Sequence, residues 1–239
     1  MATELIKTSL YGDAKGYWKL EADGTDETSN SNDLTDNGSP TYPAVKFGNG
    51  VSLLIATTDF LEITDANQTG LDITGDISGV AWGSAISLST LNPIFSKSDA
   101  GIDERGYVFG VDSNGYLYFG ASDDGSNDNR HFVRYLSDTH QISTGTLYHL
   151  AFSFDISTET CTFYLDGVSD TSSVTIGSTI GATINDSTSS FAIGCNFNAG
   201  ASSWKWNGKL DDVGVFDRLI TQVEITELNS RKTGGIIMV

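Results

Sequence analysis

Short strand-like segments separated by turn signals fill most of this chain, and they restrict what it can fold into. They are residues 17–21, 51–55, 60–63, 77–88, 93–96, 107–111, 116–120, 131–136, 146–154, 161–165, 191–195 and 208–216. Asp112-Ser113-Asn114-Gly115 and Asp166-Gly167 are turn sequences that close hairpins between neighbouring segments. Many short strands without βαβ units predict an all-β fold, a two-sheet antiparallel β-sandwich or jelly roll.

The one helical signal is at residues 221–229, where Val223, Ile225 and Leu228 alternate with Gln and Glu. A chain of 239 residues fits one large all-β domain, and no Pro-, Gly- and Ser-rich linker divides it. We predict a lead-in at 1–14, the domain at 15–232 and a tail at 233–239.

The chain is strongly acidic, with 13 Lys and Arg against 31 Asp and Glu and a formal net charge of −18. This charge argues against nucleic acid and anionic membranes as partners. No segment approaches the length of an apolar span, and the first residues do not read as a signal peptide, so we expect no membrane insertion. The sequence does not assign a cellular compartment. If the protein is part of a phage particle, we expect it to be extracellular or virion-associated.

The two cysteines lie in apolar strand patterns. Cys161 shares a predicted face with Phe163 and Leu165, and Cys195 shares one with Phe191 and Ile193. Free Cys behaves as a small hydrophobe, which favours two buried free thiols over a disulfide.

The strand predicted at 208–216 carries an acid that requires a partner. Strict alternation puts Asp211 on one face with Val213 and Val215. The other face then carries Leu210, Asp212 and Phe216. An inward carboxylate must be paired, hydrogen-bonded or bound to a cation, because burying it alone costs too much free energy. Asp211 is therefore a candidate metal ligand, with hydrogen bonding to backbone donors as the alternative.

A long polar loop follows the first strand, and residues 22–33 are dense in oxygen-bearing side chains. Long loops in compact domains are usually functional or held by something, and hard oxygen ligands suit calcium. The loop does not match an EF-hand. Zinc would require His and Cys, which the loop lacks.

Nine short motifs follow one another along the chain. They are YWKLE at 17–21, the loop 26–33, KFGNG at 46–50, DFLEI at 59–63, Trp82, TLYHLAF at 146–152, FYLDG at 163–167, AIG at 192–194 and NGKLDDV at 207–213. In this order they resemble the laminin-G-like, concanavalin A-like lectin and glucanase jelly-roll family over about residues 15–230. The resemblance implies the fold but not one function, because this fold carries many.

The resemblance also implies a structural calcium ion that ties the first strand and its loop to the last strand. Carried over to this chain, the last-strand ligand is Asp211 and the amino-terminal partner is Glu21, with Asp26, Asn30 and Asn32 from the loop.

We expect no catalysis. Glucanases of this family carry a Glu-x-Asp-x-x-Glu run, which is absent here. Asp211 and Asp212 are predicted on opposite faces of one strand, where they cannot flank one bond. His131, His140 and His149 fall in different segments, and we predict a structural role for His149. No Gly-x-Ser-x-Gly motif is present.

A glycan-binding module needs exposed aromatic rings and polar loop groups. The candidates are Trp204, Tyr116, Tyr118, His131, Asp124, Asn127 and Arg130. Trp18, Trp82 and Trp206 are expected to be core residues.

Two functions follow from these observations. The first is a non-catalytic, calcium-stabilised carbohydrate-binding module that recognises a glycan or cell-surface polysaccharide. The alternative is a structural or adhesive protein, such as a phage particle component, that forms a homo-oligomer or assembles with other structural proteins through its apolar tail 236–239.

Overall fold

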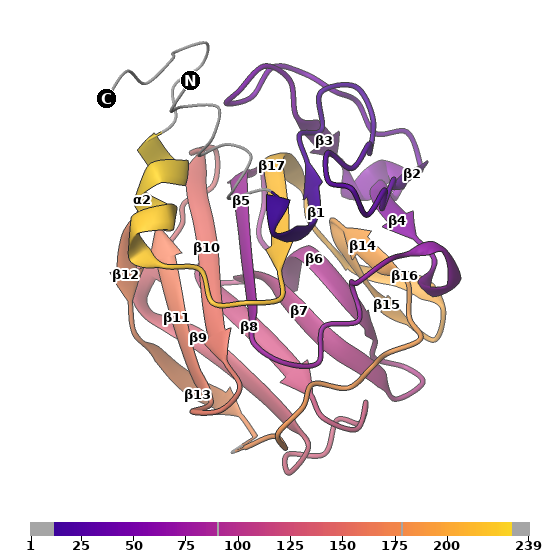
Figure 1. Cartoon of the computed structure of the whole chain (residues 1–239). Coiled ribbons are helices and arrows are strands. Elements are labelled where there is room, and N and C mark those ends of the chain that lie inside the picture. The colour runs from indigo at the N-terminus through magenta and orange to yellow at the C-terminus, as the bar shows by residue number, and fades with distance from the viewer. Residues whose placement is uncertain (1–11, 90, 178, 231–239) are drawn as a thin grey trace.

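The computed structural model describes residues 12–89, 91–177 and 179–230, in which two antiparallel sheets lie face to face (Figure 1). In this described part the first sheet has seven strands. Their order is β1 (Ala14–Trp18), β17 (Gly208–Phe216), β5 (Ile77–Ala85), β10 (Tyr148–Asp155), β11 (Thr160–Leu165) and β12 (Val168–Asp170), with β3 (Val51–Leu53) also paired to β17.

The second sheet has ten strands within the same described ranges. Their order is β13 (Ser172–Ile176), β9 (Phe132–Gln141), β8 (Tyr116–Ser122), β7 (Glu104–Asp112), β6 (Leu91–Asp99), β14 (Phe191–Ile193), β4 (Phe60–Ile63) and β2 (Thr35–Asn37), with β15 (Cys195–Asn198) and β16 (Ala201–Lys205) as a hairpin beside β6. Two 3-10 turns, η1 (Ile55–Thr57) and η2 (Asp65–Asn67), flank β4. The predicted two-sheet sandwich is confirmed.

The core lies between the sheets, and it includes a cluster of stacked and tilted phenylalanine rings. Phe109 and Phe119 of the ten-stranded sheet contact Phe152 of the seven-stranded sheet, with ring centroids 4.7 Å and 4.5 Å apart. All three rings are fully buried. Alternation along the strands therefore supplies one apolar face from each sheet.

The predicted C-terminal helix is confirmed as α2 (Gln222–Ser230), which covers part of the outer face of the seven-stranded sheet near β10 and β11 (Figure 1). Its buried residues Ile225 and Leu228 join a cluster with Tyr17 and Val80. One outer face of the sandwich is thus partly covered by the chain itself.

A β-bulge in β17 overturns one expectation. The pairing with β5 shifts between Asp211 and Gly214, and Asp212 there adopts a left-handed φ of 49°. The extra residue reverses the alternation along the strand.

Asp211 consequently does not share a face with the valines. Val213 and Val215 pack in the core together with Leu210, whereas Asp211 lies beside its cross-strand partner Trp82, outside the core cluster. The predicted inward orientation of Asp211 is wrong.

The prediction that Asp211 and Asp212 lie on opposite faces is also wrong. Asp212 accepts a hydrogen bond from the Tyr17 hydroxyl, and Tyr17 belongs to the outer cluster under α2. Both carboxylates therefore lie on the outer side of the seven-stranded sheet, where both are buried.

Both cysteines are free and buried, as predicted. Cys161 packs in the core with Phe163. Cys195 does not lie with Phe191 and Ile193, because Gly194, with φ +87°, interrupts the strand between β14 and β15. It packs instead in a small cluster with Phe60, Ala192 and Phe197.

Among the described residues we find no helix with both the length and the apolar character needed to cross a bilayer.

Candidate functional site

Asp211 is buried beneath the loop at residues 44–50. Its Oδ2 accepts hydrogen bonds from the backbone N–H groups of Lys46 (2.9 Å) and Phe47 (3.0 Å), while its buried Oδ1 has no hydrogen-bond partner. Burial raises the pKa of Asp211 to about 6. The two N–H groups oppose this rise, and the charges of Asp212 and Glu21 add to it. The predicted alternative, hydrogen bonding to backbone donors, accounts for one carboxylate oxygen only.

Glu21 also binds the loop 44–50, through two hydrogen bonds from Asn49. Its Oε2 accepts the N–H of Asn49 (2.9 Å), and its backbone carbonyl accepts the Asn49 side-chain amide (3.0 Å). A Cβ at Gly48, where φ is +101°, would lie 2.6 Å from the Glu21 carboxylate oxygens. Glycine at this position therefore permits the close approach of Glu21.

Asp26 belongs to a different, internally bonded cluster. Its two oxygens accept four hydrogen bonds, from the N–H groups of Tyr17, Thr28 and Asn32 and from the Thr28 hydroxyl. These donors occupy the positions that a metal ion would use on this carboxylate.

Asn30 and Asn32 are engaged in the same way. The Asn32 amide donates to the carbonyls of Lys15 and Thr69, and its Oδ1 accepts the N–H of Thr69 (2.7 Å). The Asn30 amide also donates to the Lys15 carbonyl. Both side chains thus fasten the polar loop to β1 through hydrogen bonds.

The five predicted calcium ligands therefore do not form one coordination set. The unpartnered Oδ1 of Asp211 fits a cation, and Glu21 is bonded to the same loop 44–50, whereas the side chains at 26, 30 and 32 are bonded to other parts of the protein. Within the described residues, the group of three metal-ligand side chains whose ligand atoms lie within 4.8 Å of one another is Asp123, Asp124 and His131.

This second group lies in the loop between β8 and β9. His131 Nδ1 is 2.8 Å from Asp123 Oδ1 and 3.6 Å from Asp124 Oδ2. Asp124 Oδ1 accepts the N–H of Ser126, and Asp123 Oδ2 accepts that of Gly181. Two of the predicted polar ligand-binding residues, Asp124 and His131, are thus brought together.

The other two predicted polar residues point to solvent. Arg130 is 80% exposed and forms a two-pronged ion pair with Asp128. Asn127 is also exposed. Neither is joined to the Asp124–His131 pair by a hydrogen bond or ion pair in the described structure.

The three predicted aromatic residues differ in exposure. Tyr116 and Trp204 are partly exposed, but Tyr118 is only 1% exposed, so its ring cannot stack on a sugar as predicted. Trp204 lies on β16, a strand that the sequence did not indicate. Trp82 and His149 are both buried and pack together, with ring centroids 5.2 Å apart.

The outer face of the ten-stranded sheet holds groups that sequence reasoning missed. On β7 and β8, Gly110 and Gly120 alternate with core residues and so face outward. On β9, Phe132 and Arg134 face outward for the same reason, and both are partly exposed. The alternation in Phe132-Val133-Arg134-Tyr135 is the sequence pattern that could have predicted Phe132 and Arg134 on the outer face.

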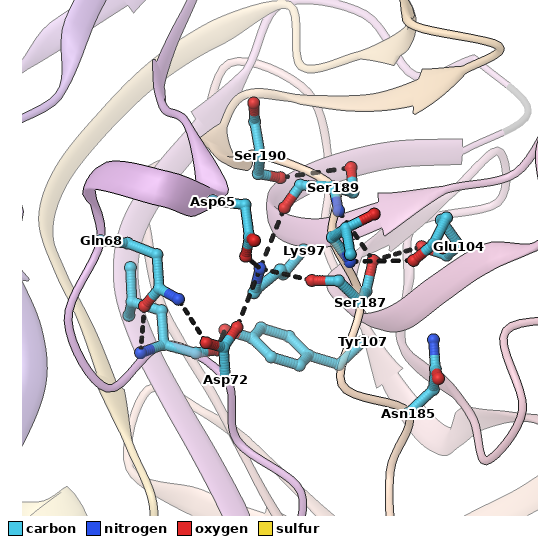
Figure 2. A network of polar contacts seen from close by, with 12 residues as sticks. Asp65, Gln68, Asp72, Lys97, Glu104, Tyr107, Asn185, Ser187, Ser189 and Ser190 are labelled. Carbon is cyan, nitrogen blue, oxygen red and sulfur yellow. Dashed lines mark hydrogen bonds and ion pairs between the residues drawn. The ribbon is translucent and has the colours of Figure 1, made fainter.

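A buried lysine organises one end of this sheet (Figure 2). Lys97, on β6, is 1% exposed, and its Nζ lies 2.5 Å from Asp65 Oδ1 and 3.0 Å from Asp72 Oδ1. It also donates to the backbone carbonyls of Ser187 (2.6 Å) and Ser189 (3.0 Å). Two segments remote in sequence are thus held by one ammonium group.

The fold defines an antiparallel jelly-roll domain built from two sheets. The family model described as the concanavalin A-like lectin/glucanases superfamily matches residues 56–226. The chain belongs to this superfamily. No curated protein sequence matches it.

Three solved structures are similar in fold. Domain 4 of AbnA, an extracellular arabinanase of Geobacillus stearothermophilus in complex with arabinotriose, is 21% identical, with 91% of this chain and 98% of that one covered and a TM-score of 0.67. The binding domain of Paraclostridial Mosquitocidal Protein 1 is 14% identical over 92% of this chain, which spans only 52% of it, with a TM-score of 0.67. The Ruminococcus gnavus IT-sialidase CBM40 bound to α2,3-sialyllactose is 9% identical (82% and 97% covered, TM-score 0.56).

Proposed function

We propose that this chain is a non-catalytic carbohydrate-binding module. The observation that carries the proposal is the outer face of the ten-stranded sheet. There, the outward Gly120 of β8 lies beside the partly exposed Phe132, an aromatic ring next to the polar Arg134. Two domains of similar fold were solved with bound sugars, arabinotriose and sialyllactose, which supports a glycan as the ligand.

The non-catalytic part of the proposal rests on the acids at the bulge. Asp211 is 1% and Asp212 5% exposed, and both accept hydrogen bonds from the protein. Buried, internally bonded carboxylates cannot act as an acid and a nucleophile on a glycosidic bond, which must reach both groups.

We also propose a structural calcium ion at Asp211. Its Oδ1 would hold the ion together with the Glu21 carboxylate, and oxygen ligands of this kind suit calcium. When bound, the ion would supply the positive charge that the buried Oδ1 lacks and tie the loop 44–50 to β17.

The test of glycan binding is a glycan-array screen followed by calorimetric titration of the hits. Trp204→Ala and Phe132→Ala are expected to weaken binding by about tenfold each, because each removes an aromatic face. Val223→Ala is the matched control, since Val223 is an exposed apolar residue on α2, over the other sheet. Binding that is unchanged in both aromatic variants would contradict the proposed face, and an array without hits would contradict the function.

A further inference from the structure

Arg134 lies on the outer face of the ten-stranded sheet, on β9, one strand in from the edge strand β13. Its neighbours Val133 and Tyr135 are core residues, so the arginine points outward from β9. It is paired across the ladder with Gly120 of β8 on one side and Ile176 of β13 on the other. A Cβ at Gly120 would lie 3.3 Å from both Phe132 Cζ and Val108 Cγ1, so these two side chains border β8 beside Arg134.

Among the described residues, no carboxylate forms an ion pair with the guanidinium of Arg134. Its Nε is buried without a hydrogen-bond partner, and the residue takes part in none of the ion pairs of the described structure. In contrast, Arg105, Arg130 and Arg218 each pair with a carboxylate. In a chain of net charge −18, an arginine without an acid is a conspicuous exception.

A second unpartnered donor lies close to it. The hydroxyl of Tyr118 is buried with no hydrogen-bond partner, although the residue is only 1% exposed. Its ring lies against Gly110, where a Cβ would come within 2.9 Å of Tyr118 Cε1. Burial raises the pKa of the Tyr118 phenol, and the charge of Arg134 lowers it, which places the two groups within electrostatic reach of each other.

The acid that also acts on this phenol is occupied elsewhere. Asp112 raises the pKa of Tyr118 by its charge, but its Oδ1 accepts the N–H groups of Asn114 and Tyr116 in the β7–β8 turn. It therefore caps the turn and leaves Arg134 without a partner.

The aromatic ring of Phe132 lies next to these two donors. A Cβ at Gly120 would lie 3.3 Å from Cζ of Phe132, so the Phe132 ring borders the same glycine that faces Arg134. The Arg134 guanidinium, the buried Tyr118 hydroxyl and the Phe132 ring thus belong to neighbouring outward positions of β8 and β9.

We propose that Arg134 and Tyr118 bind a carboxylate of an acidic sugar, such as a uronic or sialic acid, while Phe132 packs against the sugar ring. A carboxylate satisfies a guanidinium through two parallel hydrogen bonds and can accept the phenolic hydrogen as well. A neutral glycan would leave the charge of Arg134 without compensation. This proposal rests on the proposed function and deepens it by naming the class of ligand.

The experiment measures affinity for paired probes that differ only in charge: trigalacturonate against its methyl ester, and α2,3-sialyllactose against lactose. We expect at least one acidic member to bind more tightly than its neutral partner. Arg134→Gln should reduce that affinity on the order of 10- to 100-fold, and Tyr118→Phe about three- to tenfold. Arg134→Lys should rescue little, because an ammonium cannot form the paired bonds.

Melting temperatures of the variants show whether a loss of affinity comes from lost ligand contacts or from a destabilised fold. Neither Arg134→Gln nor Tyr118→Phe removes a side-chain hydrogen bond or ion pair of the described structure, so both variants should melt no lower than the wild type. Lys19→Gln, which removes an exposed charge on the other sheet's side of the chain, is the control for net charge and should leave affinity unchanged.

The two failures can be distinguished. Tight binding of neutral glycans that is insensitive to Arg134 would overturn the acidic ligand and leave the carbohydrate-binding function standing. Preference for a sulfated glycan over both carboxylated probes would overturn the carboxylate. Absence of binding to any glycan would overturn both proposals.

Discussion

The two oxygens of Asp211 are in different situations, and this difference leads to a prediction. Oδ2 anchors the loop 44–50 through two backbone N–H groups, whereas Oδ1 is buried without a partner. A charged carboxylate in this state is costly unless a cation reaches it. Calcium should therefore stabilise the folded protein and EDTA should destabilise it.

At calcium one hundredfold above its dissociation constant, the free energy of unfolding should rise by about 2.7 kcal/mol. For a chain of this size that corresponds to roughly 5–10 °C in Tm. Asp211→Asn keeps an acceptor for the two N–H groups but removes the charge, so it should abolish the increment without lowering the melting temperature in EDTA. Differential scanning calorimetry with each additive checks both statements.

Asp26→Asn is the matched control. Both oxygens of the Asp26 carboxylate already accept hydrogen bonds from the protein, so we assign no calcium to this residue. The variant should therefore lose the same amount of stability with calcium as with EDTA. A calcium increment that survives Asp211→Asn but disappears with Asp26→Asn would contradict this assignment and restore the loop 22–33 as the metal site.

Sequence reasoning at the residue scale found Asp211 but misplaced it. The need for a partner follows from chemistry alone, and so it could be predicted. The direction of the side chain depends on the bulge, and the partners of Lys97 and Arg134 depend on strands far away in sequence. Such pairings leave no local pattern for the sequence to reveal.

At the scale of elements, periodicity predicted well wherever strands run without interruption. The boundaries of β4 (Phe60–Ile63) and β17 (Gly208–Phe216) agree with the prediction. The alternation failed where one residue adopts a positive φ inside a strand region, at Asp212 and at Gly194. One extra residue moves every later side chain of the strand to the opposite face of the sheet, because side chains alternate with a period of two.

The start of α2 supports a prediction about pH. Thr221 and Glu224 form a capping box, in which the Glu224 carboxylate accepts the N–H of Thr221 (2.7 Å) and Arg218 donates to the same carboxylate (2.8 Å). Burial raises the pKa of Glu224, but these hydrogen bonds outweigh it, and the pKa lies below its usual range.

Glu224 thus binds its proton less tightly in the folded state than in the unfolded state. Its contribution to stability is present above the ordinary glutamate pKa of about 4.3 and is lost as the pH falls through the lower folded value. Glu224→Gln should be less stable than the wild type at pH 7, by about 1 kcal/mol. In urea titrations the difference should shrink below pH 4; a difference that grows toward acid would refute the capping role.

At the scale of the whole molecule, the two outer faces are treated differently. The seven-stranded sheet is partly covered by α2 (Figure 1). The loop 44–50 donates two backbone hydrogen bonds to Asp211 of β17. The ten-stranded sheet presents outward glycines and the uncompensated Arg134. The covered face serves folding, and the glycan binding that we propose falls to the other face.

Substitution of the buried Lys97 measures how much the stability of the fold depends on one long-range ionic contact (Figure 2). Lys97→Met retains an apolar stem of similar size but removes the ammonium that joins β6 to Asp65, Asp72 and the carbonyls of the 187–189 segment. Two carboxylates and two carbonyls then lose a common donor. Loss of one partner from a buried ionic cluster costs about 3 kcal/mol, or roughly 6–12 °C in Tm.

Lys15→Met provides the comparison, because Lys15 pairs with Asp217 at the surface with side chains 32% and 46% exposed. A solvent-exposed pair contributes at most about 1 kcal/mol, so this variant should melt close to the wild type. Both variants remove one positive charge, which cancels any effect of net charge. Equal melting temperatures would mean that the buried ammonium is replaceable and that the loops at 65–72 and 187–189 are held by their own hydrogen bonds; a large gap between the variants assigns that role to Lys97.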